Sequence, residues 1–184
     1  AGIMDETLFA IDQFVLRGGR LLTVVDPISL TAQAAAGQSN PFQPNPNAIP
    51  IDSNINKLIN AWGLDMPASK LVADESAATF LNGGQGQAER NAAWLSIRDI
   101  HADPKDITTS AISDLMMPFA GGFDGSVSNG LERTDLLFTS DDGFFTDHAS
   151  ARSNRIVTPS STKKVPIAVR LTGTFSTAFP NGKP

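Results

Sequence analysis

Two aspartates hold the positions in this sequence that best suit ligand chemistry. Asp26 follows the short apolar run Leu21–Val25, and Asp74 ends the run Lys70–Asp74. Open α/β sheets bind ligands in the crevice at the carboxyl ends of their strands, so two adjacent strands would bring these carboxylates together. Aspartate more commonly caps the following loop or helix, and we prefer that interpretation of Asp26 and Asp74.

The sequence lacks the residues of a conventional covalent hydrolase. It contains no cysteine, which removes thiolate nucleophiles, disulfides and thiolate metal sites together. It also lacks a Gly-x-Ser-x-Gly motif, the turn that exposes the serine nucleophile of α/β hydrolases. We therefore predict no catalytic residue, and a cryptic hydrolase is only a minor alternative.

The histidines and the acidic turn give little sign of a metal site. His101 and His148 are the only histidines and do not share the His-x-x-x-His spacing that aims two rings at one ion. Asp141, Asp142 and Asp147 lack the alternating acidic loop and terminal glutamate of a calcium site. We expect surface or loop histidines, a tight turn at the aspartates, and neither metal nor cofactor.

Two further features are better explained by structure than by binding. The loop Gly83–Gly86 lacks the Lys-Ser/Thr of a phosphate-binding P-loop and the glycine spacing of dinucleotide folds. Trp62 and Trp94 lie within apolar helix and strand patterns, so core packing is expected of both.

Length and charge limit the class of protein. The 184 residues suit one domain over 1–184, and 41% hydrophobic residues are enough to build a core. A net charge of -5 gives no general attraction to nucleic acids or anionic lipids. No apolar run is long enough to span a membrane.

The first 27 residues predict a helix followed by a buried strand. Apolar spacing and early acidic residues favour a helix over 5–16, and Gly18 and Gly19 end it. The run Leu21–Val25 then resembles a strand buried on both faces, ended by Asp26-Pro27. Such a unit is typical of a largely parallel sheet with helices on its faces.

The rest of the chain predicts further strands and a long loop. Residues 28–53 are rich in Ala, Gln, Asn, Pro and Ser and are expected to form that loop. Ser53-Asn54 is a predicted N-cap for a helix that ends at Gly63. The other expected elements are strands at 70–74, 93–97, 136–140 and 165–175, a short helix near 110–115, a return toward the sheet at 116–120, a loop at 82–91 and a turn at 141–143.

Four ordered segments resemble the gliding-motility-type ABC transporter auxiliary family. They cover nearly the whole chain in the order expected of that family, which makes chance an unsatisfactory explanation. The segments are 9–27 (FAIDQFVLRGGRLLTVVDP), 60–64 with 70–74 (NAWGL and KLVAD), 115–121 (LMMPFAG), and 165–169 with 171–180 (VPIAV and LTGTFSTAFP).

The resemblance implies a fold, a location and partners. The implied fold is a three-layer, mostly parallel α/β sheet with helices on both faces, as in flavodoxin-like and class I glutamine-amidotransferase-like proteins. The implied location is the periplasmic face of the bacterial inner membrane, with membrane attachment through segments outside this sequence. The implied partners are the permease and ATPase subunits of the transporter and other envelope proteins.

Two functional hypotheses follow. The first is a non-enzymatic interaction or scaffold domain of the transport system. The second is a small-ligand receptor of the same transporter that captures a sugar or peptide fragment in the crevice near Asp26 and Asp74. The first residues, Ala1-Gly2-Ile3, and the last, Asn181–Pro184, also suggest a fragment of a larger protein.

Overall fold

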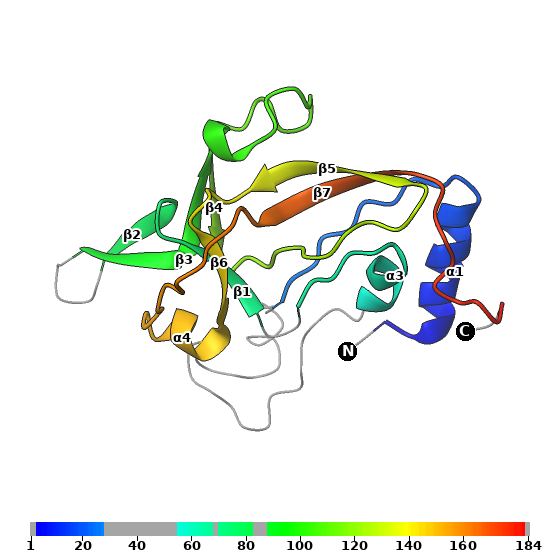
Figure 1. Cartoon of the computed structure of the whole chain (residues 1–184), viewed down its shortest axis with the longest axis horizontal. Coiled ribbons are helices and arrows are strands. Elements are labelled where there is room, and N and C mark those ends of the chain that lie inside the picture. Colours follow the sequence, from blue (N-terminus) through cyan, green and yellow to red (C-terminus); the bar gives the residue numbers. More distant parts are fainter. Residues whose placement is uncertain (1–2, 28–54, 68–69, 83–87, 183–184) are drawn as a thin grey trace. The chain divides into compact units, whose positions relative to one another are not determined.

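A computed structural model describes residues 3–27, 55–67, 70–82 and 88–182 of the chain (Figure 1). The chain divides into two compact units. The first comprises residues 1–68, 125–133 and 171–184, and the second comprises residues 69–124 and 134–170. The expectation of a single domain over 1–184 stays a prediction, and the loop expected at 28–53 lies outside the described residues.

Helix α1 (Asp5–Leu16) opens the first unit and confirms the helix predicted there. Asp5 and Glu6 lie in its first turn, where the helix dipole favours negative charge. Leu8 and Val15 are buried, and the chain leaves the helix through Gly18, whose φ of 86° suits glycine.

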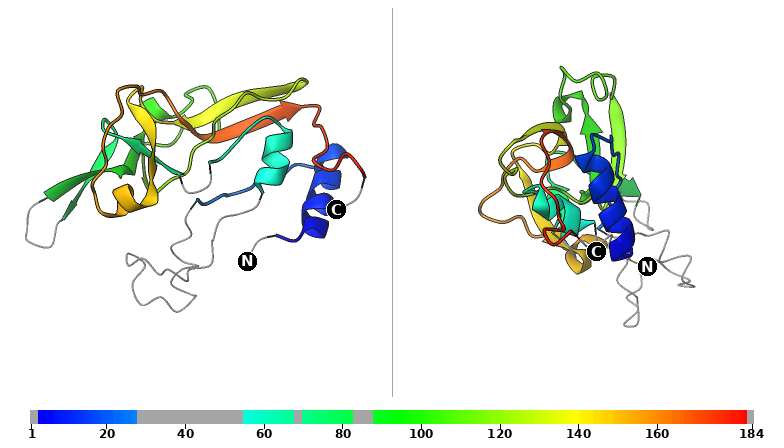
Figure 2. Two further views of the ribbon diagram at one scale, coloured as in Figure 1. Left: turned by 60° about the horizontal axis from the view of Figure 1, so that its bottom comes forward. Right: turned by 90° about the vertical axis from the view of Figure 1, so that its right-hand side faces the viewer.

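Helix α3 (Asn56–Ala61) is the second predicted helix of this unit, and both views of Figure 2 show it beside α1. Its apolar face buries Leu58 and Ile59, and Trp62 is buried directly after the helix. Gly63 has a φ of 86°, and a Cβ added there would lie 2.2 Å from the main-chain oxygen of Ser126. Only glycine fits that position. The predicted N-cap at residues 53–54 lies outside the described residues.

The second unit contains two antiparallel sheets. Strand β1 (Lys70–Asp74) pairs with β6 (Gly143–Asp147), so that Lys70 faces Asp147 and Asp74 faces Gly143. Strand β3 (Ala88–Arg98) lies between β2 (Ala78–Asn82) and β4 (Asp114–Pro118), antiparallel to both.

Two strands contribute residues to both units. These are β5 (Leu131–Phe138) and β7 (Pro166–Gly173), which form a two-stranded sheet. At one end the Thr174 N–H donates to the Gly130 oxygen at 2.9 Å, and at the other the Thr139 N–H donates to the Val165 oxygen at 3.0 Å. The strands therefore run in opposite directions.

The core of the second unit is a cluster of apolar side chains from several strands. Short helical segments, η1 (Asp99–His101) and α4 (His148–Arg152), lie outside these strands. The buried members of the cluster are Val72, Ala77, Leu95, Ile97, Ala102, Ala120, Leu137, Val165 and Ile167. A second, smaller cluster contains Ala73, Ala92 and Phe144.

The predicted parallel, three-layer, flavodoxin-like α/β fold is wrong. The strand pairs of the second unit are antiparallel, and its helical segments have only three and five residues. A parallel pair needs a crossover of about a dozen residues or more, usually a helix, and such helices are missing from the described part of this unit. The prediction extended one helix-strand pattern at the N-terminus to the whole chain.

The strand predicted at Leu21–Val25 is also wrong. No strand forms there, and Leu22 and Val24 are each 91% exposed. The apolar run has the composition of a buried strand, but a strand also needs a neighbour to complete its hydrogen bonds.

Elsewhere the sequence located strands better than helices. The strand expected at 70–74 coincides with β1, and those expected at 93–97, 136–140 and 165–175 correspond to β3, β5 and β7 with shifted ends. The helix expected near 110–115 is wrong, because that stretch forms turns that lead into β4. The loop expected at 82–91 is partly wrong, since β3 begins at Ala88. Strands β2 and β6 and helix α4 were not predicted.

Candidate functional site

The carboxylate of Asp74 is the centre of a buried hydrogen-bond network at the end of β1. Asp74 has no exposed surface. One carboxylate oxygen accepts from the main-chain N–H groups of Ser76 at 2.8 Å and Ala77 at 3.1 Å. Ser140 donates its N–H to the other oxygen at 2.6 Å and its hydroxyl to the first at 2.9 Å. Four protein donors therefore satisfy this buried charge, as burial requires.

The network continues to the turn before β6. The Ser76 hydroxyl donates to a carboxylate oxygen of Asp142 at 2.6 Å, and the Asp142 N–H donates to the Ser140 hydroxyl at 3.1 Å. The Gly143 N–H closes the turn on the Ser140 oxygen at 3.2 Å. The predicted turn at 141–143 is thereby confirmed.

The geometry around Ser140 is that of a structural clip. A serine nucleophile needs a base that accepts its proton and is itself held by a third group. The Ser140 hydroxyl instead donates to Asp74, whose two oxygens also accept the main-chain N–H groups of Ser76, Ala77 and Ser140. No histidine is hydrogen-bonded to a serine among residues 70–82 and 88–182. The arrangement joins β1 to the turn before β6.

His101 is the most buried titratable base of the second unit. Its side chain is 3% exposed, and its Nδ1 accepts the Arg98 N–H at 3.1 Å. Because Nδ1 is an acceptor, the neutral ring carries its proton on Nε2, which is buried without a hydrogen-bond partner in the described structure. Burial lowers the pKa of His101, and the nearby charge of Asp74 opposes that effect in part. The expectation of a surface or loop position is wrong for His101.

Asp26 and Asp74 belong to different units of the structure. Asp26 is exposed and belongs to the first unit, whereas the fully buried Asp74 belongs to the second. The crevice that was expected to bring them together depended on adjacent parallel strands. Leu21–Val25 is not a strand, and β1 pairs antiparallel with β6. Asp74 has the capping role preferred above, while ligand binding by Asp26 and Asp74 stays a prediction.

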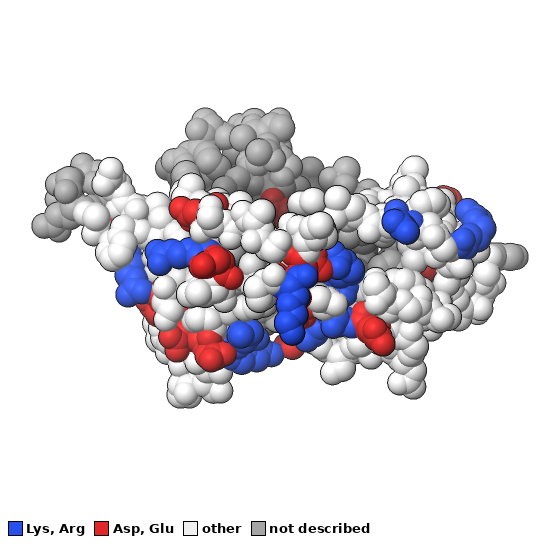
Figure 3. Space-filling model, turned by 90° about the horizontal axis from the view of Figure 1, so that it is seen from above, with Lys and Arg blue, Asp and Glu red and all other residues white. Residues whose placement is uncertain are grey.

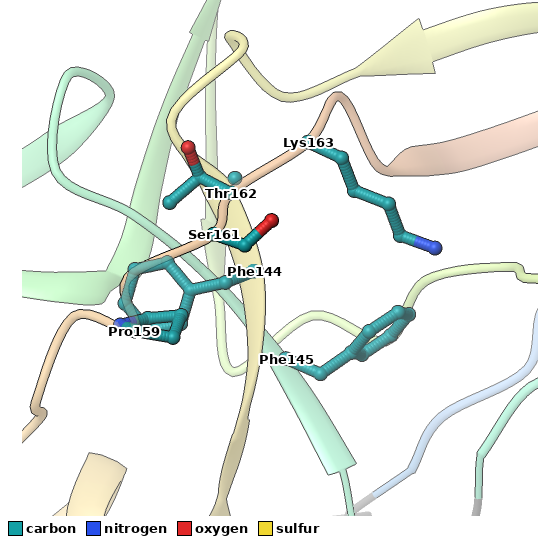
Figure 4. Close-up of a pocket in the computed structure, with 7 residues that line it drawn as sticks. Phe144, Phe145, Pro159, Ser161, Thr162 and Lys163 are labelled. Carbon is teal, nitrogen blue, oxygen red and sulfur yellow. The ribbon is translucent and has the colours of Figure 1, made fainter.

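A shallow cavity of about 300 Å³ lies over the start of β6 (Figure 4). Its walls are the stretch Gly143–Phe145 on one side and Pro159 with Ser161–Lys163 on the other. Phe144 is buried, and Lys163 forms an ion pair with Asp124 at 3.0 Å. The hydroxyl groups of Ser161 and Thr162 are the neutral polar side chains of the lining. This cavity brings together neither a nucleophile with a base nor a set of metal ligands.

The acidic residues near the turn have structural partners. Asp147 accepts the Ser150 N–H at 2.9 Å and caps helix α4, which lowers the pKa of Asp147. Among the described ranges, no group of three or more His, Asp or Glu side chains has the arrangement of a metal site.

Sequence reasoning missed the second buried carboxylate, Asp12 on α1. Asp12 is 1% exposed and accepts from the Thr177 hydroxyl at 2.7 Å and the Ala178 N–H at 2.9 Å. Nearby, the rings of Phe9 and Phe179 meet edge to face with centroids 5.3 Å apart. A polar residue inside an otherwise apolar helix pattern was the available signal. The contact joins two of the four segments on which the family resemblance depends.

Aromatic packing explains the two tryptophans. Trp62 is 5% exposed, packs edge to face on Phe175, and donates its indole N–H to the Ser176 oxygen at 3.2 Å. Trp94 packs edge to face on Phe119 with ring centroids 5.8 Å apart. The predicted packing role is confirmed for Trp62 and agrees with the ring contact of Trp94.

Positive and negative side chains are intermixed on the face drawn in Figure 3. The second unit contains two ion pairs, Lys163 with Asp124 and Arg170 with Asp106. The Arg170 guanidinium and the Thr108 donors hold the pKa of Asp106 well below its usual range. Such a surface suits protein contacts better than a polyanion, which favours clustered positive charge.

None of the helices in the described ranges is long and apolar enough to cross a bilayer.

Comparison with known proteins identifies the family. Neither a curated protein nor a solved structure matches the chain. A family model described as an ABC-type uncharacterized transport system matches residues 1–184. The chain therefore belongs to this family of ABC-type transport systems.

Proposed function

We propose that the chain is a non-enzymatic auxiliary domain that works by binding other subunits of an ABC transporter of the gliding-motility type. Its partners are the permease and ATPase subunits and other envelope proteins. It acts at the periplasmic face of the bacterial inner membrane, and segments outside this sequence attach it there.

The family match over residues 1–184 is the observation that carries this proposal. The polar network supports it. The two fully buried carboxylates, Asp12 and Asp74, are saturated by hydrogen bonds from the chain itself, and each joins segments far apart in sequence. Buried charges with this many internal partners build structure, because a ligand would have to displace the protein donors.

Co-purification tests the interaction role. The full-length protein is expressed with its transporter's permease and ATPase subunits, and one component is captured in mild detergent. We expect the three proteins to elute together at fixed stoichiometry. Elution of the auxiliary protein alone, under conditions where the permease still retains its ATPase, contradicts the proposal.

Enzyme activity and location need separate tests. The purified protein is expected to hydrolyse none of a panel of ester, amide and glycoside substrates above the rate of its Ser140→Ala variant. Protease added to intact spheroplasts is expected to digest this domain while a cytoplasmic marker survives. Turnover that Ser140→Ala abolishes, or full protection from protease, overturns the corresponding part of the proposal.

The gliding-motility assignment is tested by genetics. Deletion of the coding gene in a gliding bacterium that carries it is expected to stop colony spreading, and the intact gene is expected to restore it. Normal spreading of the deletion strain contradicts this assignment. The role in the transporter would then still be tested by the co-purification experiment.

A further inference from the structure

A single imidazole holds the turn at the end of strand β3. Helix η1 (Asp99–His101) follows β3 directly, and in Figure 1 it is the green helical turn beyond that strand. The buried ring of His101 folds back, so that its Nδ1 accepts the N–H of Arg98, the last residue of β3, at 3.1 Å. The turn is therefore held by a hydrogen-bond acceptor that protonation removes.

The segment after η1 is attached to β5. Ala102 forms an antiparallel bridge with Leu137, and the Asp103 N–H donates to the Leu136 oxygen at 3.0 Å. Ala102 and Leu137 also belong to the core cluster of the second unit. His101 therefore holds the chain at the point where it passes from β3 to its contact with β5.

We propose that His101 is a pH-sensitive switch, whose protonation releases the segment Arg98–Asp103 from β5. In the neutral ring the proton is on Nε2, and Nδ1 is the acceptor. A second proton binds Nδ1, which then becomes a donor directed at the Arg98 N–H. Two donors cannot form a hydrogen bond, so the ring must leave its position and η1 must turn with it. This inference goes beyond the binding role proposed above, and its test needs no transporter subunit.

The surroundings of the ring do not stabilise the added charge. Nε2 is buried and has no hydrogen-bond partner in the described structure. The charged groups that act on the ring are Asp74 on β1, Arg98 on β3, Asp99 on η1 and Lys164 before β7, so two are negative and two are positive. The oxygens of Asp74 already accept from four donors. A buried imidazolium without an acceptor is unfavourable, so the protonated ring is more stable in water.

The size of the effect follows from the ordinary pKa of histidine. Once the turn is open, the ring binds a proton with a pKa of about 6.5, whereas burial opposes protonation in the closed turn. The closed turn therefore has its full stability above about pH 6.5 and loses stability relative to the open turn as the pH falls. Between pH 7.5 and pH 5.5, one proton shifts this equilibrium by up to about tenfold.

Amide hydrogen exchange tests the switch. Protection factors of Arg98 and Asp103, corrected for the intrinsic pH dependence of exchange, are expected to fall about tenfold between pH 7.5 and pH 5.5. The opening exposes little surface, so low urea should leave these two amides unaffected. The Val72 N–H, which donates to the Ala120 oxygen in the core, should exchange faster as urea is added. Identical protection and urea dependence at Arg98, Asp103 and Val72 would show global unfolding alone and overturn the proposal.

Two variants identify the group that binds the proton. In His101→Asn the side-chain oxygen can still accept the Arg98 N–H but does not titrate, so the fall in protection is expected to disappear. His148→Asn removes the other histidine and is expected to keep the tenfold fall. A pH effect that persists in His101→Asn, or that is lost in His148→Asn, contradicts the proposal.

The unmodified protein provides a measurement that does not depend on the variants. The ring ¹⁵N chemical shifts of His101 are expected to show a neutral ring with its proton on Nε2 at pH 7.5. A neutral ring with its proton on Nδ1 could not accept the Arg98 N–H, and that result also overturns the proposal.

Discussion

Asp12 on α1 accepts a hydrogen bond of 2.7 Å from the Thr177 hydroxyl, which joins positions 165 residues apart in the sequence. The same carboxylate accepts the Ala178 N–H at 2.9 Å. The two ends of the first unit are therefore connected through one buried charge. This contact gives the resemblance segments at both ends of the chain a shared structural role.

Replacement of Asp12 by alanine is expected to destabilise the first unit. The change leaves the Ala178 N–H without its acceptor in a buried position, and hydrogen bonds to charged groups contribute more than neutral ones. We expect a loss of about 3 kcal/mol in the free energy of unfolding, measured by urea denaturation. Asp5→Ala removes an exposed ion pair with Lys57 and should cost less than about 1 kcal/mol. Equal losses would show that Asp12 is not a structural anchor.

Replacement of Asp74 by asparagine is expected to disturb the second unit. One oxygen becomes an amide NH₂ group, which faces donors instead of accepting from them. We expect a loss of about 3 kcal/mol in the free energy of unfolding. The control is Asp141→Asn, an exposed change in the same turn with an expected effect within about 0.5 kcal/mol. If Asp74→Asn matches its control, the network around Ser140 does not stabilise the fold.

Gly18 and Gly63 have the same φ of 86°. Alanine substitution at the two positions therefore separates the cost of backbone strain from the cost of steric clash. Gly18→Ala meets no heavy atom within 4 Å, so its cost is the left-handed conformation alone, about 1 kcal/mol. Gly63→Ala adds a Cβ at 2.2 Å from the Ser126 oxygen, and overpacking should raise the total loss to about 3 kcal/mol. Thermal unfolding of both variants measures the difference. Similar melting temperatures for the two variants contradict the packing around Gly63.

The buried histidine predicts lower stability in mild acid. Burial lowers the pKa of His101 in the folded state, so below about pH 6.5 the unfolded chain binds a proton that the folded chain resists. This contribution to stability is complete above that pH and is lost as the pH falls. Asp74, Arg98, Asp99 and Lys164 are the charged groups that act on the ring.

The measurement compares melting temperatures at pH 7.5 and pH 5.5. On acidification, the melting temperature of the wild type is expected to fall further than that of His101→Asn. The side-chain oxygen of this asparagine can still accept the Arg98 N–H, so the variant keeps that hydrogen bond. The pKa of His148 is also lowered by burial, so His148→Asn measures its separate share of the effect. An unchanged pH dependence in His101→Asn would exclude the ring of His101 as its source.

Much of the local structure followed from the sequence. Acidic residues at Asp5 and Glu6, apolar spacing and Gly18 were enough to locate α1 at Asp5–Leu16, because capping and the helix dipole act within a few residues. The apolar run at Lys70–Asp74 located β1 for a similar reason. Strand β2 was missed because its side chains are half-buried or exposed, which leaves no apolar pattern to detect.

The candidate site was only partly predictable. The preference of aspartate for capping gave the role of Asp74 correctly, since a carboxylate readily accepts from main-chain N–H groups two and three residues later. The contribution of Ser140, 66 residues further along the chain, had no local sign. Asp12 was missed for the same reason, because its partners lie at the other end of the sequence.

The sequence by itself determined the family of transport systems, the main helix and the positions of most strands, because these depend on motifs and on side chains close together in the chain. Only the tertiary structure decided that the strands pair antiparallel, that Asp12 and Asp74 are buried anchors, and that Leu22 and Val24 are exposed. Strand direction and burial depend on which distant segments meet. An apolar run in a sequence indicates that its side chains favour burial, but it does not indicate which segment buries them.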